Sequence, residues 1–322
     1  MIYQYTQTHM QTKLSQFFNI KTEFNTKHKR CFIYDPSNSR AIFESEPQIK
    51  DEFIVKKLGI SLYLRNCEEA AKYDFPTIQT DATIPLLKSN LQKAVRRGKN
   101  IVAMATTLAI LQKEPTELIR RLAIICIEDV CVMDTYPVLV WLMMTDKHYL
   151  LKAGDFYLIL QIVNTLCNCT QTFDHTYKYK EIVLNHESLQ DLKRHDVLLA
   201  LFYRQKYGGM KGDIEMLSSA ISFYSTNHGQ IVKTDFSSID CEIYEELEIL
   251  PEAIDCHPFP FILDNINKKT GLENSKIKEF IWFAESAWNF RKLHTQITSE
   301  NYKSHPEWEL IEKHLYNERG RL

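Results

Sequence analysis

The sequence predicts a mainly α-helical protein, built as a multi-helix globular body. Apolar residues make up 44% of the 322 residues and charged residues 25%, the balance of a soluble globular chain. Nine glycines and ten prolines are few for this length, which disfavours an all-β architecture with many tight turns. Apolar residues also recur at helical spacing in several segments, and no internal repeat or low-complexity stretch interrupts them.

The first 50 residues are the least helical part of the sequence. Residues 1–30 are polar with isolated aromatic residues, which predicts a flexible tail. Cys31–Tyr34 and Ala41–Phe43 flank a turn-like Asp35–Asn38, a pattern typical of a short hairpin. From about residue 51 onward the pattern predicts helices.

The central helices follow from their start and stop signals. In residues 87–101, Leu, Ala, Val and Ile share one helix face and lysines and arginines lie round the other. Pro115 suits the first turn of a helix, so a mostly buried helix is predicted over Leu118–Met133. Asp134–Pro137 ends that helix. The apolar run Pro137–Met144 is too short to span a bilayer and is predicted to be a buried helix.

The second half is predicted to be helical with a looped middle. Phe156–Leu166 and His195–Tyr207 have helical patterns, and Gly208 and Gly209 end the second of these. Residues 225–250 are polar and acidic, which favours loops, and Ile277–Ile297 is predicted to be the closing helix. Three parts are therefore expected: a tail over 1–30, a helical domain over 31–180, and a second helical region over 181–322 packed on it.

Charge, cysteine usage and the first residues limit the class of protein. The formal net charge of −2 excludes a generally basic nucleic-acid binder but leaves local basic faces open. The eight cysteines form neither a CxxC pair nor a Cys/His array at zinc spacing, so we expect reduced thiols, no metal and no cofactor. No secretory signal is visible. With the short basic run Lys27–Arg30, this favours an intracellular protein, nuclear or at a viral or cellular replication site.

Residues 11–18 read Gln-Thr-Lys-Leu-Ser-Gln-Phe-Phe. A short helical turn would place Leu14, Phe17 and Phe18 on one side as an apolar plug, with Gln11 beside it. This stretch resembles the PCNA-interacting peptide, or PIP box, and every defined position of that pattern is filled. The resemblance implies a PCNA-type sliding clamp as partner. The alternative is that the three apolar residues dock onto the chain's own core, or match by accident.

Residues 87–133 carry a second pattern. A basic helix with Arg96 and Arg97 precedes a helix with paired Arg120 and Arg121 and, further on, Glu128-Asp129. This order resembles the C-terminal region of the clamp-loader-like AAA+ ATPases of replication-associated recombination, where it forms a helical collar through which subunits oligomerise. The resemblance implies a partly collar-like domain and a possible homo-oligomer. The same charges would also serve as a salt-bridge network within the core.

The chain departs from that ATPase family at two points. Cys131 stands where the family usually has glycine. No Gly-x-x-x-x-Gly-Lys-(Ser/Thr) occurs anywhere, so no P-loop is available to hold a triphosphate. An ATPase of that type is therefore excluded, and a collar-like domain that works without ATP remains.

Seven basic residues are candidates for nucleic-acid contact. The first cluster is Lys88, Lys93, Arg96, Arg97 and Lys99, and the second is the pair Lys206 and Lys211. Phosphate contacts need such clustering, although a solvated helix face would show the same pattern. The second pair belongs to the glycine-rich loop 206–213, whose backbone N–H groups are able to form an anion-binding nest. A helix end followed by a turn explains that loop equally well.

Asp255, Cys256 and His257 form the best candidate for chemistry. Asp255 and His257 suit an acid/base pair, and Cys256 with His257 suits a metal. A two-proline turn that packs aromatic residues into the core explains the same segment. A crowd of aromatics over residues 282–290 fits either base stacking or core packing.

These patterns together predict a sliding-clamp-binding accessory protein of DNA replication or repair. It would lack ATPase activity, bind DNA or replication partners, and not enter a membrane. One alternative is a clamp-recruited DNA-processing enzyme that uses Asp255, His257 and the 206–213 loop. The other is a purely structural interaction protein.

Overall fold

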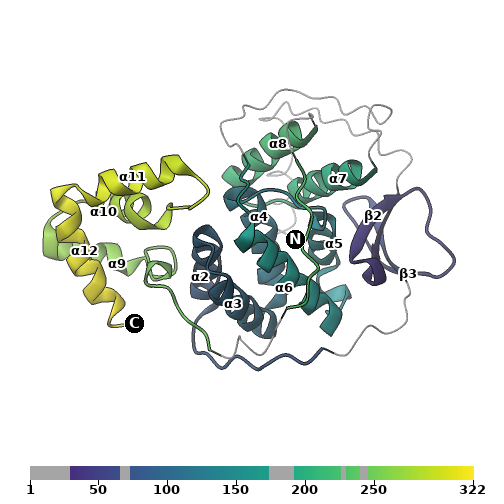
Figure 1. Ribbon diagram of the computed structural model, residues 1–322, viewed down its shortest axis with the longest axis horizontal. Helices are drawn as coiled ribbons and strands as arrows, with labels where there is room; N and C mark the ends of the chain where they lie inside the picture. Colours follow the sequence, from purple (N-terminus) through teal and green to yellow (C-terminus); the bar gives the residue numbers. More distant parts are fainter. Residues whose placement is uncertain (1–29, 66–72, 174–191, 226–229, 240–245) are drawn as a thin grey trace, which may run out of the picture.

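The computed structural model describes residues 30–65, 73–173, 192–225, 230–239 and 246–322 (Figure 1). Helices dominate these ranges, as the sequence predicts. The strands are β1 (Cys31–Asp35), β2 (Arg40–Glu44), β3 (Asp51–Lys57) and β4 (Ile60–Arg65). The α-helices are α2 (Ile84–Arg97), α3 (Asn100–Lys113), α4 (Pro115–Asp129), α5 (Tyr136–Thr145), α6 (Ala153–Asn168), α7 (Leu192–Tyr207), α8 (Lys211–Ser225), α9 (Phe261–Thr270), α10 (Asn274–Ile281), α11 (Leu293–Lys303) and α12 (Pro306–Arg319). The short helical turns are η2 (Pro36–Asn38), η3 (Asp146–His148), η6 (Pro251–Ala253) and the π-helical η7 (Trp282–Ser286).

The four strands form one sheet in the order β2-β1-β4-β3, at the opposite end of the molecule from α9–α12 (Figure 1). β1 and β2 pair antiparallel, so the predicted hairpin over residues 31–50 is confirmed. The prediction of helices from residue 51 is wrong, because β3 and β4 pair there as a second hairpin. Leu58 and Gly59 turn it with positive φ angles of 55° and 84°, the geometry of a two-residue hairpin loop.

The buried centre of the molecule is α5, every residue of which is buried. This confirms the prediction of a buried helix over Pro137–Met144. Trp141 Nε1 donates a hydrogen bond of 3.1 Å to the carbonyl of Phe32, which joins α5 to β1. Among the described helices none combines the length and the apolar character needed to cross a membrane.

Three helix boundaries differ from the prediction. Gly98, with φ of 64°, ends α2, so residues 87–101 are not one helix and Ile101 belongs to α3. α4 ends at Asp129, and Met133 forms an isolated bridge with Val232 instead of continuing the helix. The predicted closing helix over Ile277–Ile297 is broken, because α10 changes into the π-helical η7 and α11 starts afresh.

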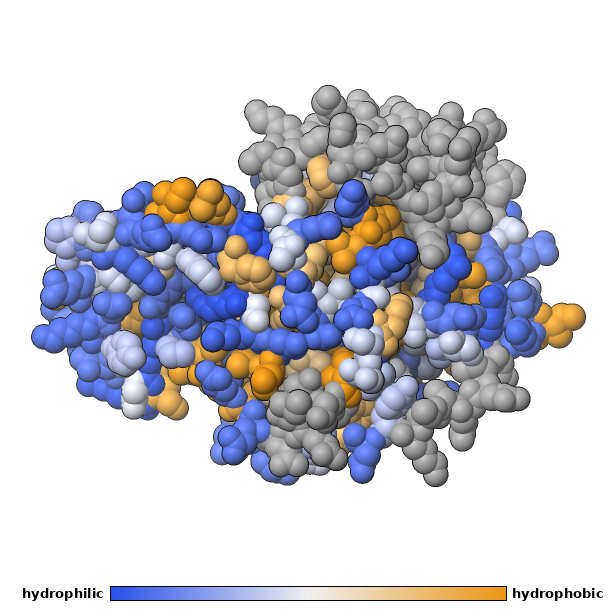
Figure 2. Space-filling model, in the orientation of Figure 1, coloured by the Kyte–Doolittle hydropathy of each residue, from blue (hydrophilic) through white to orange (hydrophobic). Residues whose placement is uncertain are grey.

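Two hydrophobic cores divide the described residues. The larger holds residues of the sheet and of α2–α8 and reaches Ala253. The smaller is built by α9, α10 and α12 with part of η7, and Tyr302 of α11 packs against it. The division therefore falls close to residue 255 and not near residue 180, because α7 and α8 pack into the first core. Figure 2 shows a hydrophobic patch over α11, the helix on which Leu293 and Ile297 are exposed.

Candidate functional site: a charged cleft between the two cores

A cleft of about 550 Å³ lies where the two cores meet. It brings together α2, α4, the start of α8, the segment around His257 and the first residue of η7. We call it the α2–α8 cleft. Its lining is Pro85, Lys88, Ser89, Gln92, Lys93, Arg96, Arg121, Glu128, Met210, Gly212, Asp213, Met216, His257, Pro258 and Trp282.

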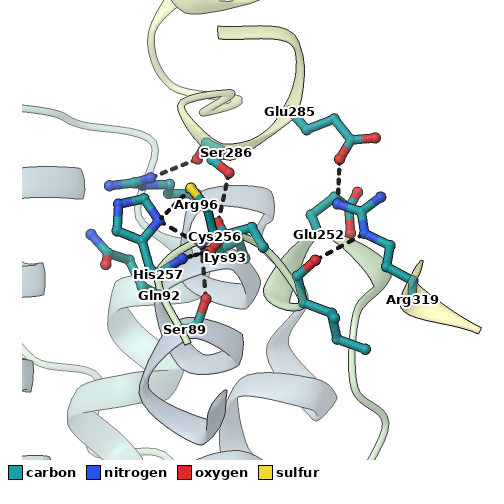
Figure 3. A network of polar contacts seen from close by, with 12 residues as sticks. Ser89, Gln92, Lys93, Arg96, Glu252, Cys256, His257, Glu285, Ser286 and Arg319 are labelled. Carbon is teal, nitrogen blue, oxygen red and sulfur yellow. Dashed lines mark hydrogen bonds and ion pairs between the residues drawn. The ribbon is translucent and has the colours of Figure 1, made fainter. Parts of the chain in front are cut away.

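Lys93 and Asp255 form a buried ion pair at the inner wall of the cleft. Figure 3 shows Lys93 between Ser89 and Ser286, with His257 beside it. Lys93 Nζ donates to Asp255 Oδ2 at 2.7 Å and to Ser89 Oγ at 2.9 Å. Ser286 Oγ donates to the same carboxylate oxygen at 2.8 Å. Burial lowers the pKa of Lys93 below its ordinary value, and Asp255 opposes this. The pair joins α2 to the segment that precedes α9, and Ser286 links it to η7.

Arg96 forms the second buried ion pair of the cleft. Its Nε lies 2.5 Å from Asp129 Oδ1, its Nη2 lies 2.7 Å from Glu128 Oε1, and its Nη1 donates to the carbonyl of Ser286. Although burial by itself lowers the pKa of Arg96, the two carboxylates raise it above the ordinary value. Gln92 Nε2 donates to Asp129 Oδ2 at 2.8 Å, so both carboxylate oxygens of Asp129 are used.

His257 is the half-exposed member of the inner wall. Its Nδ1 lies 3.0 Å from Asp255 Oδ1, which also accepts the backbone N–H of His257 at 2.8 Å. The hydrogen bond to Asp255 raises the pKa of His257 to about 9, so the imidazole is a cation at neutral pH. Burial raises the pKa of Asp255, but its bond to His257 and the charge of Lys93 outweigh this, and the pKa falls below the ordinary value.

Trp282 gives the cleft an aromatic wall. Its ring centroid lies 5.8 Å from that of His257 and 5.4 Å from the guanidinium carbon of Arg96. The residue opens the π-helical turn η7, a local irregularity of a kind that is frequent at functional sites. The same turn directs the carbonyl and hydroxyl of Ser286 to the two buried ion pairs.

The expected exposed basic face of five residues is wrong for Lys93 and Arg96. Both are 4% exposed, because carboxylates far away in the sequence neutralise them inside the protein. Arg97 is largely buried and lies 3.3 Å from Glu252. It shares a second, smaller cavity of about 300 Å³ with Lys99. Lys88 alone of the five has a partly exposed side chain in the lining of the α2–α8 cleft, where it lies 2.6 Å from Glu117.

The glycine-rich loop reaches the cleft, but its two lysines do not line it. Met210, Gly212 and Asp213 are lining residues. Lys206 lies over the ring of Phe202 at 5.1 Å. Lys211 is exposed and lies 3.8 Å from Glu215. The loop is thus part of the site, although not through the residues expected to contact nucleic acid.

Three side chains in the cleft wall or directly behind it were not among the predicted site residues. Arg121 was assigned to the collar-like helix, yet it lines the cleft, lies 3.8 Å from Glu128 and donates a hydrogen bond to Gln92. Ser286 carried no sequence signal. Trp282 was one of several aromatics at the same spacing, so the sequence did not distinguish it from core residues.

The expected clamp-binding residues Gln11, Leu14, Phe17 and Phe18 lie outside the described residues. Asp255, Cys256 and His257 do bring three potential metal ligands within 4.8 Å of one another. The arrangement does not fit a metal, because the ammonium of Lys93 lies 2.7 Å from Asp255 Oδ2 and the other oxygen of Asp255 is bonded to His257. An added cation would have to displace Lys93.

Two observations therefore define the site. Residues of α2, of the 206–213 loop and of the 255–257 segment converge on one cleft, although 162 residues separate Lys93 from Asp255. Cationic and aromatic side chains share its wall. Comparison with known protein families, characterised proteins and solved structures finds no significant match, so the functional interpretation of this chain depends on its motifs and on the geometry of the cleft.

Proposed function

We propose that this chain is a sliding-clamp-tethered accessory protein of DNA replication or repair, and that its folded body binds a single DNA strand in the α2–α8 cleft. The observation that carries the DNA contact is the convergence of three partly exposed cations and one aromatic ring on a single cleft. The tether is the motif with Gln11, Leu14, Phe17 and Phe18, which matches the clamp-binding pattern at every defined position.

The cations suit phosphate groups. The side chains of Lys88, Arg121 and His257 are 29%, 26% and 49% exposed, so they remain accessible at the cleft wall. The two more deeply buried cations, Lys93 and Arg96, are neutralised from behind by Asp255 and Asp129. Arg121 and Glu128 are separated by 3.8 Å, a loose pair that a phosphate is able to replace.

The ring of Trp282 suits a base. Stacking of a base on an aromatic side chain contributes about 1–3 kcal/mol and tolerates any base sequence. A cleft of about 550 Å³ has the size of a small-ligand pocket and is far too narrow for a duplex. A single strand or a strand end, held by phosphate contacts and one stacked base, therefore fits better than double-stranded DNA.

The first test addresses the tether. A peptide spanning Met10–Lys21 and the whole protein are titrated calorimetrically against a PCNA-type clamp. The variant Phe17→Ala/Phe18→Ala serves as control. We expect saturable binding that the double substitution removes. Binding that survives the substitution, or none at all, would refute the tether and leave a protein that interacts only through its body.

The second test addresses the cleft. Fluorescence anisotropy with a labelled single strand compares the wild type with Lys88→Gln/Arg121→Gln at several salt concentrations. Removal of two phosphate contacts reduces the slope of log affinity against log salt by about 1.4, because each contact on a single strand contributes about 0.7. Lys313→Gln on α12 is the matched control, since it removes an exposed positive charge outside the cleft. An equal loss of strand affinity in the control would show that the affinity depends on the overall charge of the protein and not on the cleft.

A clamp-recruited DNA-processing enzyme is the second candidate, and the Asp255–His257 pair favours it. Asp255 holds Nδ1 of the ring, and the half-exposed imidazole lines the cleft. A ring that is protonated at neutral pH acts as a general acid, which suits protonation of a leaving group. Turnover of a single strand by the wild type that His257→Asn abolishes even at saturating strand concentration would select the enzyme. Binding without turnover selects the accessory protein.

A further inference from the structure

Two cysteine side chains lie against each other away from the α2–α8 cleft. The Sγ atoms of Cys131 and Cys169 are 3.7 Å apart, although 38 residues separate them in the sequence. Cys131 lies two residues after the end of α4 and is 2% exposed, whereas Cys169 directly follows α6 and is partly exposed. The sulfurs need to approach by less than 2 Å to reach the bonding distance of about 2.0 Å.

Arg291 gives the partly exposed thiol a positive neighbour. Its Nε donates to the carbonyl of Cys169 at 2.6 Å, and its other nitrogens donate to the carbonyls of Cys167 and Val95. These contacts cover carbonyls at the carboxyl end of α6, which would otherwise disfavour a nearby thiolate. A cation beside a thiol favours the reactive thiolate form.

The pKa values of the two thiols are shifted in opposite directions, as a reactive pair requires. The hydrogen bond from Cys131 lowers the pKa of Cys169, and the same contact, together with burial, raises the pKa of Cys131. Cys167 is close in sequence but buried, and burial raises its pKa to about 12. Cys169 is therefore the accessible nucleophile, Cys131 the neighbouring protonated thiol, and Cys167 an unreactive internal comparison.

We propose that Cys169 and Cys131 form a peroxide-sensitive thiol pair that closes reversibly into a disulfide. The Cys169 thiolate attacks a hydroperoxide, its sulfur gains one oxygen and becomes a sulfenic acid, and the peroxide leaves as hydroxide or alkoxide. The Cys131 thiol then attacks that sulfur, the S–S bond forms, and the oxygen leaves as water with the proton of Cys131. A thiol reductant returns both groups to the starting state.

The pair lies where oxidation affects the junction between the two cores. The carbonyl of Cys169 and the carbonyl of Val95 on α2 are held by the same arginine, which follows η7. Movement of Cys169 toward Cys131 therefore acts on contacts that join α6 and α2 to the segment leading into α11. This inference is independent of the proposed DNA and clamp binding.

The test oxidises the full chain with a small excess of hydrogen peroxide and maps the bond by mass spectrometry. Trypsin combined with a Glu-specific protease separates Cys126 from Cys131 by cleavage after Glu128, and a Cys167→Ala variant removes the ambiguity at Cys169. We expect a 131–169 disulfide in the wild type and in Cys167→Ala, and its loss on reduction. Cys131→Ala should accumulate a sulfenic acid at Cys169 that dimedone traps.

Two results would overturn the proposal. One is oxidation of Cys169 no faster than that of the other cysteines, as measured by differential alkylation over time. The other is a wild-type protein in which Cys169 is oxidised but pairs with any residue other than Cys131. Circular dichroism of Cys131→Ala and Cys169→Ala checks that each variant is folded, and in Cys169→Ala neither the disulfide nor the dimedone adduct should appear.

Discussion

Replacement of Asp255 should destabilise the protein more than replacement of its partner Lys93. Asp255→Asn leaves Lys93, which is 4% exposed, with Ser89 as its remaining partner among the described contacts. An orphaned buried charge costs about 3–5 kcal/mol. Neutralising a lysine at pH 7 costs about 4–5 kcal/mol, since each unit below its ordinary pKa near 10.4 costs about 1.4 kcal/mol. The loss should therefore be about 3–5 kcal/mol.

The reverse substitution leaves a better-satisfied group. In Lys93→Met, Asp255 keeps the hydroxyl of Ser286, the backbone N–H of His257 and the imidazolium of His257. The expected loss is about 1.5–3 kcal/mol, the cost of one hydrogen bond to a charged group. The double variant Lys93→Met/Asp255→Asn should recover a large part of the Asp255→Asn loss, because no unpaired buried cation remains.

The pH dependence makes the test sharper. In Asp255→Asn the native pKa of Lys93 lies further below its unfolded value, so the unfolded state binds more protons and stability rises between pH 7 and 10. In the wild type the raised pKa of His257 contributes stability below its unfolded pKa, and this is lost as the pH rises through about 9. Both effects make the difference in the free energy of unfolding between the wild type and Asp255→Asn smaller at pH 9.5 than at pH 7.

Urea denaturation followed by circular dichroism gives the free energies, with the m value checked because two cores are present. Lys88→Met is the matched control on the same helix. Its pair with Glu117 is partly exposed, so less than about 1 kcal/mol should be lost. The reasoning is refuted if Lys93→Met lowers the free energy of unfolding as much as Asp255→Asn does. It is also refuted if the difference between the wild type and Asp255→Asn does not change with pH.

Three further predictions concern the cleft and the helix junction. The affinity of the wild type for a single strand, measured by anisotropy, should fall as the pH rises through about 9, whereas the affinity of His257→Gln should stay level. The reason is that the raised pKa of His257 keeps the imidazole charged below that pH. Trp282→Ala should weaken the same binding by about 1–3 kcal/mol with an unchanged salt slope, because a stacked base is lost and no phosphate contact; an altered slope would contradict this. Gly98→Ala should lower the melting temperature by at least the equivalent of about 1 kcal/mol, because φ is 64° and the added Cβ would meet Phe290 at 3.0 Å. Gly212→Ala is the control: its Cβ meets nothing within 4 Å, so the melting temperature should not fall.

Much of the fold was accessible from sequence because local chemistry determines it. Pro115 marks the start of α4, Gly208 follows the end of α7, and the unbroken apolar run of α5 indicates a buried helix. The second hairpin was missed, although Leu58-Gly59 is a turn signal between the two strands.

The site was accessible only in part. The sequence alone gives the stretch that resembles a PIP box, the absence of a P-loop, the basic character of α2 and the Asp255–His257 segment. It does not say whether a lysine on an amphipathic helix meets water or a buried carboxylate, since both give the same pattern. Only the tertiary structure places Asp255, 162 residues away, against Lys93 and turns an expected DNA contact into a buried ion pair. Long-range electrostatics is decided by packing, because no local spacing encodes which distant charge will be near.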